Sequence, residues 1–270
     1  MLAENNRRIA LTIAGSDPGG GAGIQADLKT FAALGVYGYS VITAVIAQNS
    51  AAVRSVAPVE PAMVAAQIET LAAERVPDAL KTGALANAAI VETVADLVMR
   101  LGLPAPVVDP VMIASSGAPL LDEAGRRALV DRLIPIARVV TPNLPEAQAL
   151  SGIAAATPAA IREMARRIHA MGARAVVIKG GHREAESAAI DLLFDGGDFV
   201  EIVGERIAGG GAHGTGCAFS AAIAAGLARG LELEDAVREA KDYVARAIRA
   251  SFTLGAGRPL LDHFARDRDD

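Results

Sequence analysis

Tryptophan is absent from this 270-residue chain, and only 3% of its residues are aromatic. Single-stranded nucleic acids are bound largely by stacking of bases on aromatic side chains, so this scarcity argues against them as partners. The net charge of −5 and the lack of a basic run point the same way, because polyanions are attracted by positive surfaces. We therefore expect a small-molecule partner and no nucleic acid.

Cysteine occurs only once, as Cys217, which excludes an internal disulfide and suits a reducing compartment. No charge-free apolar stretch reaches the roughly 20 residues of a membrane span, and residues 1–8 lack the apolar core of a signal peptide. The 52% of hydrophobic residues suffice for a large core. These features predict a cytoplasmic protein without membrane contact, forming a single domain over residues 1–270 with loose tails at 1–7 and 265–270.

Short β-type apolar runs alternate with helix-forming stretches along the whole chain. Strands are expected near residues 9–13, 39–45, 79–83, 106–112, 139–141 and 175–182, with a β-hairpin over 188–203. Helices are expected over residues 24–34, 61–73, 87–101, 121–133, 158–171, 221–228 and 233–251, with a further helix opening near 146. The continuous apolar run at 39–45 is typical of a strand buried on both faces. The alternation predicts an α/β fold with a doubly wound, mostly parallel sheet and helices on both faces.

Glycine is concentrated between the first strand and the first helix, over residues 14–23. Gly15 and Gly20 have Walker-type spacing, but Gly21-Ala22 stand where that loop needs lysine and a hydroxyl residue. A dinucleotide-binding loop that starts at Gly19 would need glycine at Ile24. The stretch is therefore expected to contact substrate or to act as a lid, and a plain connecting turn is an equal alternative.

Polar residues follow most of the expected strands. In an open α/β sheet, ligands bind at the carboxyl ends of the strands, so these residues should share one rim. They are Gly15-Ser16-Asp17, Gln48, Lys81-Thr82, Asp109, Asn143 with Glu146, and Lys179.

The same rim should receive Gly214-Thr215-Gly216-Cys217, which precedes a strongly helix-forming run. Unpaired backbone N–H groups and the positive end of the helix dipole make such a start suitable for an anion. A thiol at this position is expected to have a lowered pKa, which would make it a base or nucleophile. The alternative is an ordinary loop followed by a small buried cysteine.

Two carboxylates on the rim, Asp109 and Glu146, are hard oxygen ligands of the kind that Mg²⁺ prefers. Lys179 could neutralise phosphate charge, and phosphoryl transfer needs mainly positioning and charge stabilisation from the protein. Each carboxylate also has a simpler explanation. Glu146 could complement a helix dipole, and Asp109 could belong to an Asp-Pro turn.

Six motifs together give the chain a resemblance to the hydroxymethylpyrimidine/phosphomethylpyrimidine kinases of thiamine biosynthesis, in the ribokinase-like superfamily. The resemblance extends from about Ile9 to Phe264, and Cys217 is its most discriminating residue, because sugar kinases of the superfamily carry aspartate there. The motifs are Ala14–Asp27, Thr43–Asn49, Asp109–Met112, Thr141–Ala147, Ile178–His182 and His213–Cys217.

The resemblance implies an ATP- and Mg²⁺-dependent kinase, commonly dimeric, that phosphorylates 4-amino-5-hydroxymethyl-2-methylpyrimidine and then its monophosphate. It implies that Gln48 binds the pyrimidine edge and that Gly15, Asp17, Ala22, Ala84 and Val111 line the substrate pocket. Gly214, Thr215 and Gly216 would hold the transferred phosphoryl group, while Cys217 takes or orients the hydroxyl proton. Asp109 and Glu146 would hold the metal, with Asn143, Lys179 and Thr215 at the nucleotide.

Two positions depart from the family pattern. Ala84 stands where the family usually has methionine, which enlarges the expected pocket, and residues 208–212 lack the usual polar side chains. The larger pocket keeps a pyridoxal-type kinase open as an alternative. A non-catalytic vitamer-binding relative is a third possibility, although no catalytic position has been lost.

Overall fold

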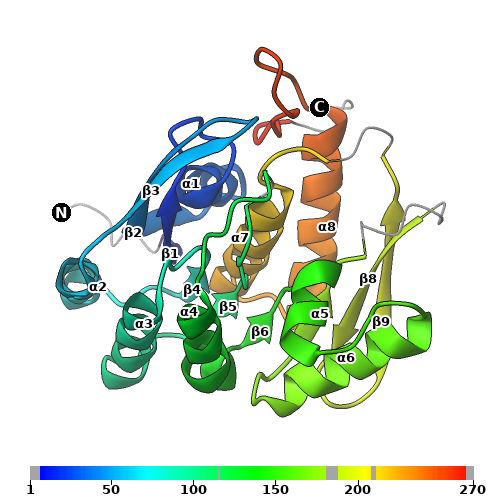
Figure 1. Ribbon diagram of the computed structural model, residues 1–270, viewed down its shortest axis with the longest axis horizontal. Helices are drawn as coiled ribbons and strands as arrows, with labels where there is room; N and C mark the ends of the chain where they lie inside the picture. Colours follow the sequence, from blue (N-terminus) through cyan, green and yellow to red (C-terminus); the bar gives the residue numbers. More distant parts are fainter. Residues whose placement is uncertain (1–6, 115, 181–187, 208–210, 266–270) are drawn as a thin grey trace.

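The computed structural model describes residues 7–114, 116–180, 188–207 and 211–265, and a nine-stranded sheet forms the centre of this part of the chain. The strands are β1 (Ile9–Ser16), β2 (Tyr37–Gln48), β3 (Val53–Pro58), β4 (Ala79–Thr82), β5 (Val107–Val108), β6 (Val139–Val140), β7 (Val176–Ile178), β8 (Ala188–Phe194) and β9 (Phe199–Glu205). Their order is β3-β2-β1-β4-β5-β6-β7-β8-β9 (Figure 1). The six strands from β2 to β7 in this order are parallel, whereas β3, β8 and β9 each run antiparallel to a neighbour.

Helices cover both faces of the sheet, as the alternation of elements predicts (Figure 1). They are α1 (Gly23–Ala33), α2 (Pro61–Glu74), α3 (Ala88–Arg100), α4 (Glu123–Ala128), α5 (Leu144–Ser151), α6 (Pro158–Ala170), α7 (Thr215–Ala228) and α8 (Leu233–Arg249). Helices α1, α7 and α8 pack on one face, with α7 against β1, β4 and β5. Helices α2, α3, α4 and α6 belong to the opposite layer.

The short central strands are buried on both faces because both layers of helices cover them. Successive side chains of a strand point to opposite faces. Val107 and Val139 accordingly join the core under α7 and α8, while their neighbours Val108 and Val140 join the core under α3 and α6. Helix α7 is almost entirely buried and rich in alanine, which lets it lie close to the sheet.

Three local expectations differ from the structure. Strand β3 has no counterpart among the expected elements. Beyond Ala44, strand β2 is covered on one face only, so Val45 is 58% exposed and the expectation of a strand buried on both faces is wrong for this part. The expected helix over residues 121–133 is α-helical only at Glu123–Ala128, after which a π-helical turn spans Leu129–Leu133.

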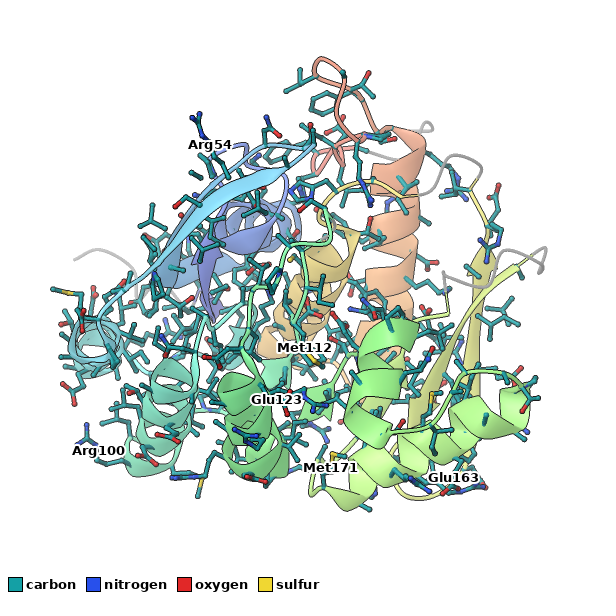
Figure 2. The ribbon with its side chains drawn as sticks, in the orientation of Figure 1. Arg54, Arg100, Met112, Glu123, Glu163 and Met171 are labelled. Carbon is teal, nitrogen blue, oxygen red and sulfur yellow. The ribbon has the colours of Figure 1, made fainter. Side chains whose placement is uncertain are left out.

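Charged side chains project from the outer faces of the molecule. Figure 2 shows Arg54, Arg100 and Glu163 at its periphery, whereas Met112 lies inside. Within the described ranges, no helix combines the length and hydrophobicity that crossing a bilayer requires.

Candidate active site

The carboxyl ends of β4, β5, β6 and β7 meet along one edge of the sheet. There the backbone N–H of Asp109 donates to the Thr82 carbonyl at 3.0 Å, and that of Lys179 donates to the Pro142 carbonyl at 2.9 Å. Asn143 and Lys179 also form a parallel bridge. Asp109, Asn143 and Lys179 therefore share the rim that the strand-end rule predicts.

Lys81 lies within β4 and not past its end, so the expectation of a residue that follows the strand is wrong. It lies inside β4 with a fully buried side chain, and its Nζ is 2.7 Å from Oδ2 of Asp27 on α1. Successive side chains of a strand point to opposite faces, and Lys81 points under the helices. The end of a four-residue strand cannot be located from the sequence to better than one or two positions, so the sequence could not show that Lys81 lies inside the strand.

The glycine-rich loop between β1 and α1 is folded around Asp17. The Asp17 carboxylate accepts hydrogen bonds from the N–H groups of Gly19, Gly21 and Ala22 at 2.8–3.1 Å and is hydrogen-bonded to Nε2 of His213 at 3.0 Å. Burial raises the pKa of Asp17, but the His213 and backbone hydrogen bonds outweigh it and leave this pKa below its usual value. The structure thus uses Asp17, expected to contact substrate, to shape the loop and to join it to the loop before α7.

Close packing between these two loops requires glycine on both sides. Gly214 has φ of +85°, and a Cβ there would overlap the carbonyl of Gly21. A Cβ on Gly21 would in turn lie 2.9 Å from Cδ2 of His213. The backbone N–H of His213 donates to the Pro259 carbonyl at 2.8 Å, and this bond also holds His213 in place.

Helix α7 begins at Thr215, six residues before the expected start at residue 221, and the glycines lie at its N-terminus, as the sequence predicts. Its first-turn N–H groups belong to Thr215, Gly216 and Cys217, and no side chain in the described part of the chain caps them. The Thr215 hydroxyl instead donates to the Ala212 carbonyl at 2.8 Å. The helix therefore presents backbone donors and a positive dipole end, which is the arrangement that binds phosphate at helix N-termini.

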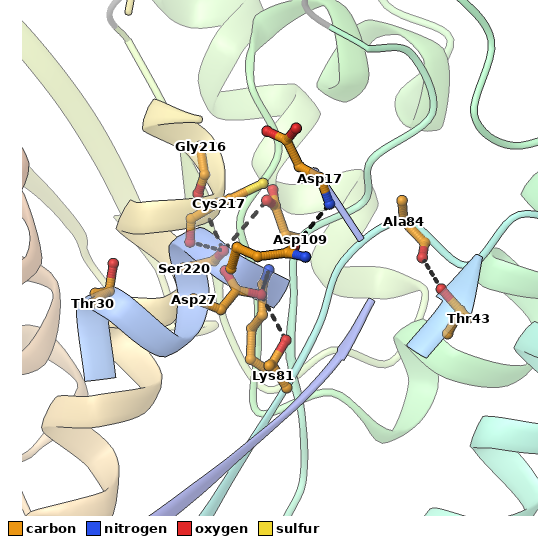
Figure 3. Close-up of polar contacts among 12 residues, drawn as sticks. Asp17, Asp27, Thr30, Thr43, Lys81, Ala84, Asp109, Gly216, Cys217 and Ser220 are labelled. Carbon is orange, nitrogen blue, oxygen red and sulfur yellow. Dashed lines mark hydrogen bonds and ion pairs between the residues drawn. The ribbon is translucent and has the colours of Figure 1, made fainter. Parts of the chain in front are cut away.

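Lys179 and Asp109 lie beside this helix start. Figure 3 shows Asp109 near Gly216 and Cys217. Nζ of Lys179 is 3.0 Å from Oδ1 of Asp109, and the Ser220 hydroxyl donates to Oδ2 at 3.3 Å. Although burial lowers the pKa of Lys179, the nearby Asp109 and Glu146 raise it above its usual value, so the ammonium is charged. A Cβ on Gly216 would lie 3.2 Å from Nζ, so glycine leaves room for the lysine at the helix end.

Cys217 follows in the same turn, and the expectation of an acidic thiol is wrong for this structure. Burial raises the pKa of Cys217 to about 11, although the positive charge of Lys81 lowers it. Asp109 and Asp27 add to the increase, while the N–H of Gly23 acts in the opposite direction. The cost of removing a thiolate from water outweighs the nearby positive charge, so Cys217 is a neutral thiol at physiological pH.

Glu146 and Asn143 form a capping box at the start of α5. The Asn143 side chain accepts from the Glu146 N–H, and the Glu146 carboxylate accepts from the Asn143 N–H, both at 2.8 Å. Burial raises the pKa of Glu146 to about 7; Lys179 opposes this rise and Asp109 adds to it. Glu146 thus lies in the first turn of α5, as expected for a carboxylate that complements the helix dipole, and it caps the helix as well. With Asp109 it provides two carboxylates of the type that Mg²⁺ prefers.

In the described residues, no group of three or more histidine, cysteine, aspartate or glutamate side chains is arranged to hold a metal. A magnesium site built on Asp109 and Glu146 would consequently depend on water and substrate oxygens for its other ligands, which is the usual situation for Mg²⁺ in kinases.

The residues expected at the pyrimidine are only partly brought together by observed contacts. The N–H of Gly15 donates to the Ala84 carbonyl at 3.1 Å, and the Thr43 hydroxyl donates to the same oxygen at 2.6 Å. Gln48 ends β2, and its neighbour Asn49 lies close to Gly19 of the glycine-rich loop. Val111 is tied to Asp109 by a backbone hydrogen bond of 2.8 Å. His182 and residues 208–210 fall outside the described residues.

Sequence reasoning missed the side-chain pairs that cross the molecule. Asp17 with His213 and Asp27 with Lys81 join positions that are 196 and 54 residues apart. A charged residue in an otherwise apolar strand, such as Lys81, could have indicated such a pair, because a buried charge requires a partner.

The family model and the curated relatives that match this chain point to the same family. The model for phosphomethylpyrimidine kinase matches residues 17–262. The hydroxymethylpyrimidine/phosphomethylpyrimidine kinase of Rhizobium meliloti is 49% identical over 263 residues, which cover 96% of this chain and 97% of that protein. The thiamine biosynthesis bifunctional protein ThiED of Geobacter sulfurreducens is 45% identical, with 97% of this chain and 54% of that protein covered, so the chain spans about half of its length.

Solved structures of similar fold include two kinds of vitamin kinase. The ADP complex of Bacillus subtilis pyridoxal kinase superposes with a TM-score of 0.88 at 40% identity, covering 96% of this chain and 98% of that one. The phosphomethylpyrimidine kinase of Clostridium difficile 630 superposes with a TM-score of 0.79 at 38% identity, covering 90% and 100%.

Proposed function

Because the chain belongs to the phosphomethylpyrimidine kinase family, we propose that it uses ATP to phosphorylate 4-amino-5-hydroxymethyl-2-methylpyrimidine and then its monophosphate in thiamine biosynthesis. Curated relatives that share nearly the full length of the chain are named for both activities. The observation that carries the proposal is the uncapped start of α7, with Cys217 in its first turn and the Lys179–Asp109 pair beside it.

The charges of the rim suit an in-line phosphoryl transfer. The N–H groups of Thr215, Gly216 and Cys217 would hydrogen-bond to the oxygens of the transferred group, and the Lys179 ammonium would neutralise charge that develops on the nucleotide. Asn143 would stand beside the nucleotide. ATP as the donor is supported by the neighbouring kinase structures described with ADP and with AMP-PCP.

A magnesium ion would be held by Asp109 and Glu146 together with water. It would supply positive charge to the phosphates. The fit rests on the two buried carboxylates, since Glu146 has a raised pKa that a nearby cation would lower.

The substrate pocket would lie between the glycine-rich loop and the ends of β2, β4 and β5. A Cβ on Gly15 would lie 2.9 Å from Cδ1 of Ile46, so glycine keeps this wall close. Gln48 offers an amide with both donor and acceptor for the aminopyrimidine edge, and no described side chain or backbone group occupies it through a hydrogen bond in the structure. Ala22, Ala84 and Val111 would complete the wall, and Asp17 would act by holding the loop.

A pyridoxal kinase activity is the second candidate. Ala84 removes side-chain volume from the expected pocket, and the Staphylococcus aureus structure with AMP-PCP and pyridoxal superposes with a TM-score of 0.88 at 36% identity. The additional space would admit the more heavily substituted pyridine ring of pyridoxal.

We further propose a cytoplasmic homodimer. Strand β3 is an edge strand whose backbone faces no further strand in the described part of the sheet. Tyr37 and Val45 on the neighbouring β2 are more than half exposed. An edge of this kind is usually covered or paired.

ATP consumption measured with the pyrimidine alcohol, its monophosphate and pyridoxal tests these alternatives. Turnover of both pyrimidine compounds is the expected result. Turnover of pyridoxal alone would replace the first function by the second, and tight binding without turnover of any compound would overturn both.

A further inference from the structure

A buried ion pair lies beneath the thiol of Cys217 and has no part in the phosphate site (Figure 3). Asp27 and Lys81 are both fully buried, with Nζ and Oδ2 2.7 Å apart. The Thr12 hydroxyl donates to the same Oδ2 at 2.6 Å. The second carboxylate oxygen of Asp27, Oδ1, has no hydrogen-bond partner among the described residues. Leaving a buried carboxylate oxygen unpaired is costly, so this position calls for an explanation.

The geometry of α1 directs Asp27 towards the thiol. Gly23 and Asp27 are four residues apart, and therefore lie on the same face of the helix. Helix α1 packs against α7, and Figure 3 shows Asp27 and Cys217 in the same cluster of side chains. Side chains in a helix lean towards its N-terminus, so the Asp27 carboxylate extends towards the first turn of α1.

Charged groups face Cys217 from three elements. Figure 3 shows Asp27 of α1, Lys81 of β4 and Asp109 at the end of β5 around Cys217, and the charges of all three act on its thiol. Moving the thiol proton to Asp27 converts an aspartate anion and a neutral thiol into a neutral acid and a thiolate. The net charge of the cluster is unchanged, and the Lys81 ammonium, no longer neutralised by Asp27, can stabilise the thiolate. A transfer that creates no net charge avoids most of the cost of ionising a buried thiol alone.

We propose that Asp27 is the proton acceptor for Cys217 and that Lys81 is the cation that stabilises the resulting thiolate, an assignment that rests on the proposed kinase function. The thiol proton passes to Oδ1 of Asp27. The thiolate then accepts the proton of the substrate hydroxyl as that oxygen forms its bond to the γ-phosphorus of ATP. The bond between this phosphorus and the bridging oxygen breaks, and its electron pair leaves with ADP. Asp27 finally releases to solvent the one proton that the reaction produces. Both are positioning residues, since they act through Cys217.

The single cysteine allows a direct test without substrate. The rate of alkylation by iodoacetamide, followed by intact mass from pH 7 to pH 12, reports the thiolate fraction of Cys217 alone. Asp27→Asn removes the acceptor and leaves Lys81 charged, so we expect the alkylation profile to shift to lower pH by about one unit or more. The same variant should nevertheless lose at least 100-fold in kcat, although its thiol is more acidic. A purely electrostatic role would give the opposite kcat result.

The double variant Asp27→Asn, Lys81→Gln keeps a neutral hydrogen-bonded pair and provides a folded alternative if the single variant is unstable. It should return the alkylation profile to within half a unit of wild type or to higher pH, while kcat remains low. Asp191→Asn is the matched control, because Asp191 also pairs with a buried lysine, Lys241, at 2.7 Å. Its alkylation profile should stay unchanged.

An Asp27→Asn profile that coincides with wild type, or a kcat within twofold of wild type, would overturn the proposal. The alkylation result does not depend on turnover. A wild-type protein that phosphorylates none of the three compounds would therefore refute the proposed function, while a shifted profile would still establish the contact between Asp27 and the thiol.

Discussion

Two helices begin on the same rim, and their first turns are built in opposite ways. At α5, the Asn143 side chain and the Glu146 carboxylate hydrogen-bond to the backbone N–H groups. At α7, within the described ranges, glycine takes the place of the cap and no side chain reaches those groups. One helix end is thus capped by its own side chains, whereas the other has no side-chain cap among the described residues, as the proposed phosphate site requires.

The largest effect is expected at the open helix start. Cys217→Ala should lower kcat by about 10²–10⁴-fold, because it removes the group that is proposed to accept the hydroxyl proton. The dissociation constant of the pyrimidine alcohol, measured by calorimetry, should change by less than about threefold, since the small side chain adds little to ring binding. An unchanged kcat would remove Cys217 from the reaction.

Gly216→Ala adds one carbon beside the lysine. Its Cβ would lie 3.2 Å from Nζ of Lys179 and 3.8 Å from Oδ2 of Asp109, so the pair must shift by a few tenths of an ångström. Steady-state kinetics should show a loss of roughly 10–100-fold in kcat/KM for ATP, because small misplacements of charged groups are costly in catalysis. Gly197→Ala, in the β8–β9 turn, is the matched control: its Cβ would meet its nearest atom at 3.5 Å. Equal effects of the two substitutions would contradict the account.

Glu146 makes stability depend on pH in a defined direction. Its pKa is raised from 4.5 to about 7 in the folded protein, so its favourable contribution is fully present below pH 4.5 and is lost as the pH rises towards 7. Glu146→Gln should remove this slope, which is on the order of 3 kcal/mol across the window. Urea unfolding of both proteins from pH 4.5 to pH 8 measures it. Parallel curves would show that burial does not perturb Glu146.

The smallest effect is expected at the cap. Asn143→Ala should lower the free energy of unfolding by about 1 kcal/mol, since one N–H of α5 loses its acceptor. Asn143→Asp keeps an acceptor and should restore most of that loss. Urea titration of the two variants gives both values, and an alanine variant as stable as wild type would show that the cap is dispensable.

Much of the architecture could be predicted because it depends on local patterns. Alternating apolar runs located the parallel strands, and the hairpin of β8 and β9 was marked by Asp195-Gly196-Gly197. Strand β3 escaped because Val53–Pro58 contains arginine, serine and proline and is mostly exposed, as suits an edge strand. Its identity as a strand comes from pairing with β2.

The site was predictable as a set of residues and much less as a set of contacts. Strand ends and the glycines before α7 placed Asp109, Lys179 and Cys217 on one rim. The acidity of Cys217 was predicted with the wrong sign, because the helix dipole can be inferred locally whereas burial by α1 and β4 cannot. Pairing of Asp17 with His213 likewise requires knowledge of how two distant loops pack.

A crystal structure with AMP-PCP and the pyrimidine alcohol tests the central claim most directly. The account predicts that γ-phosphate oxygens accept hydrogen bonds from the N–H groups of Thr215 and Gly216, with the alcohol oxygen beside the sulfur of Cys217. A nucleotide whose terminal phosphate lies away from the start of α7 would contradict it.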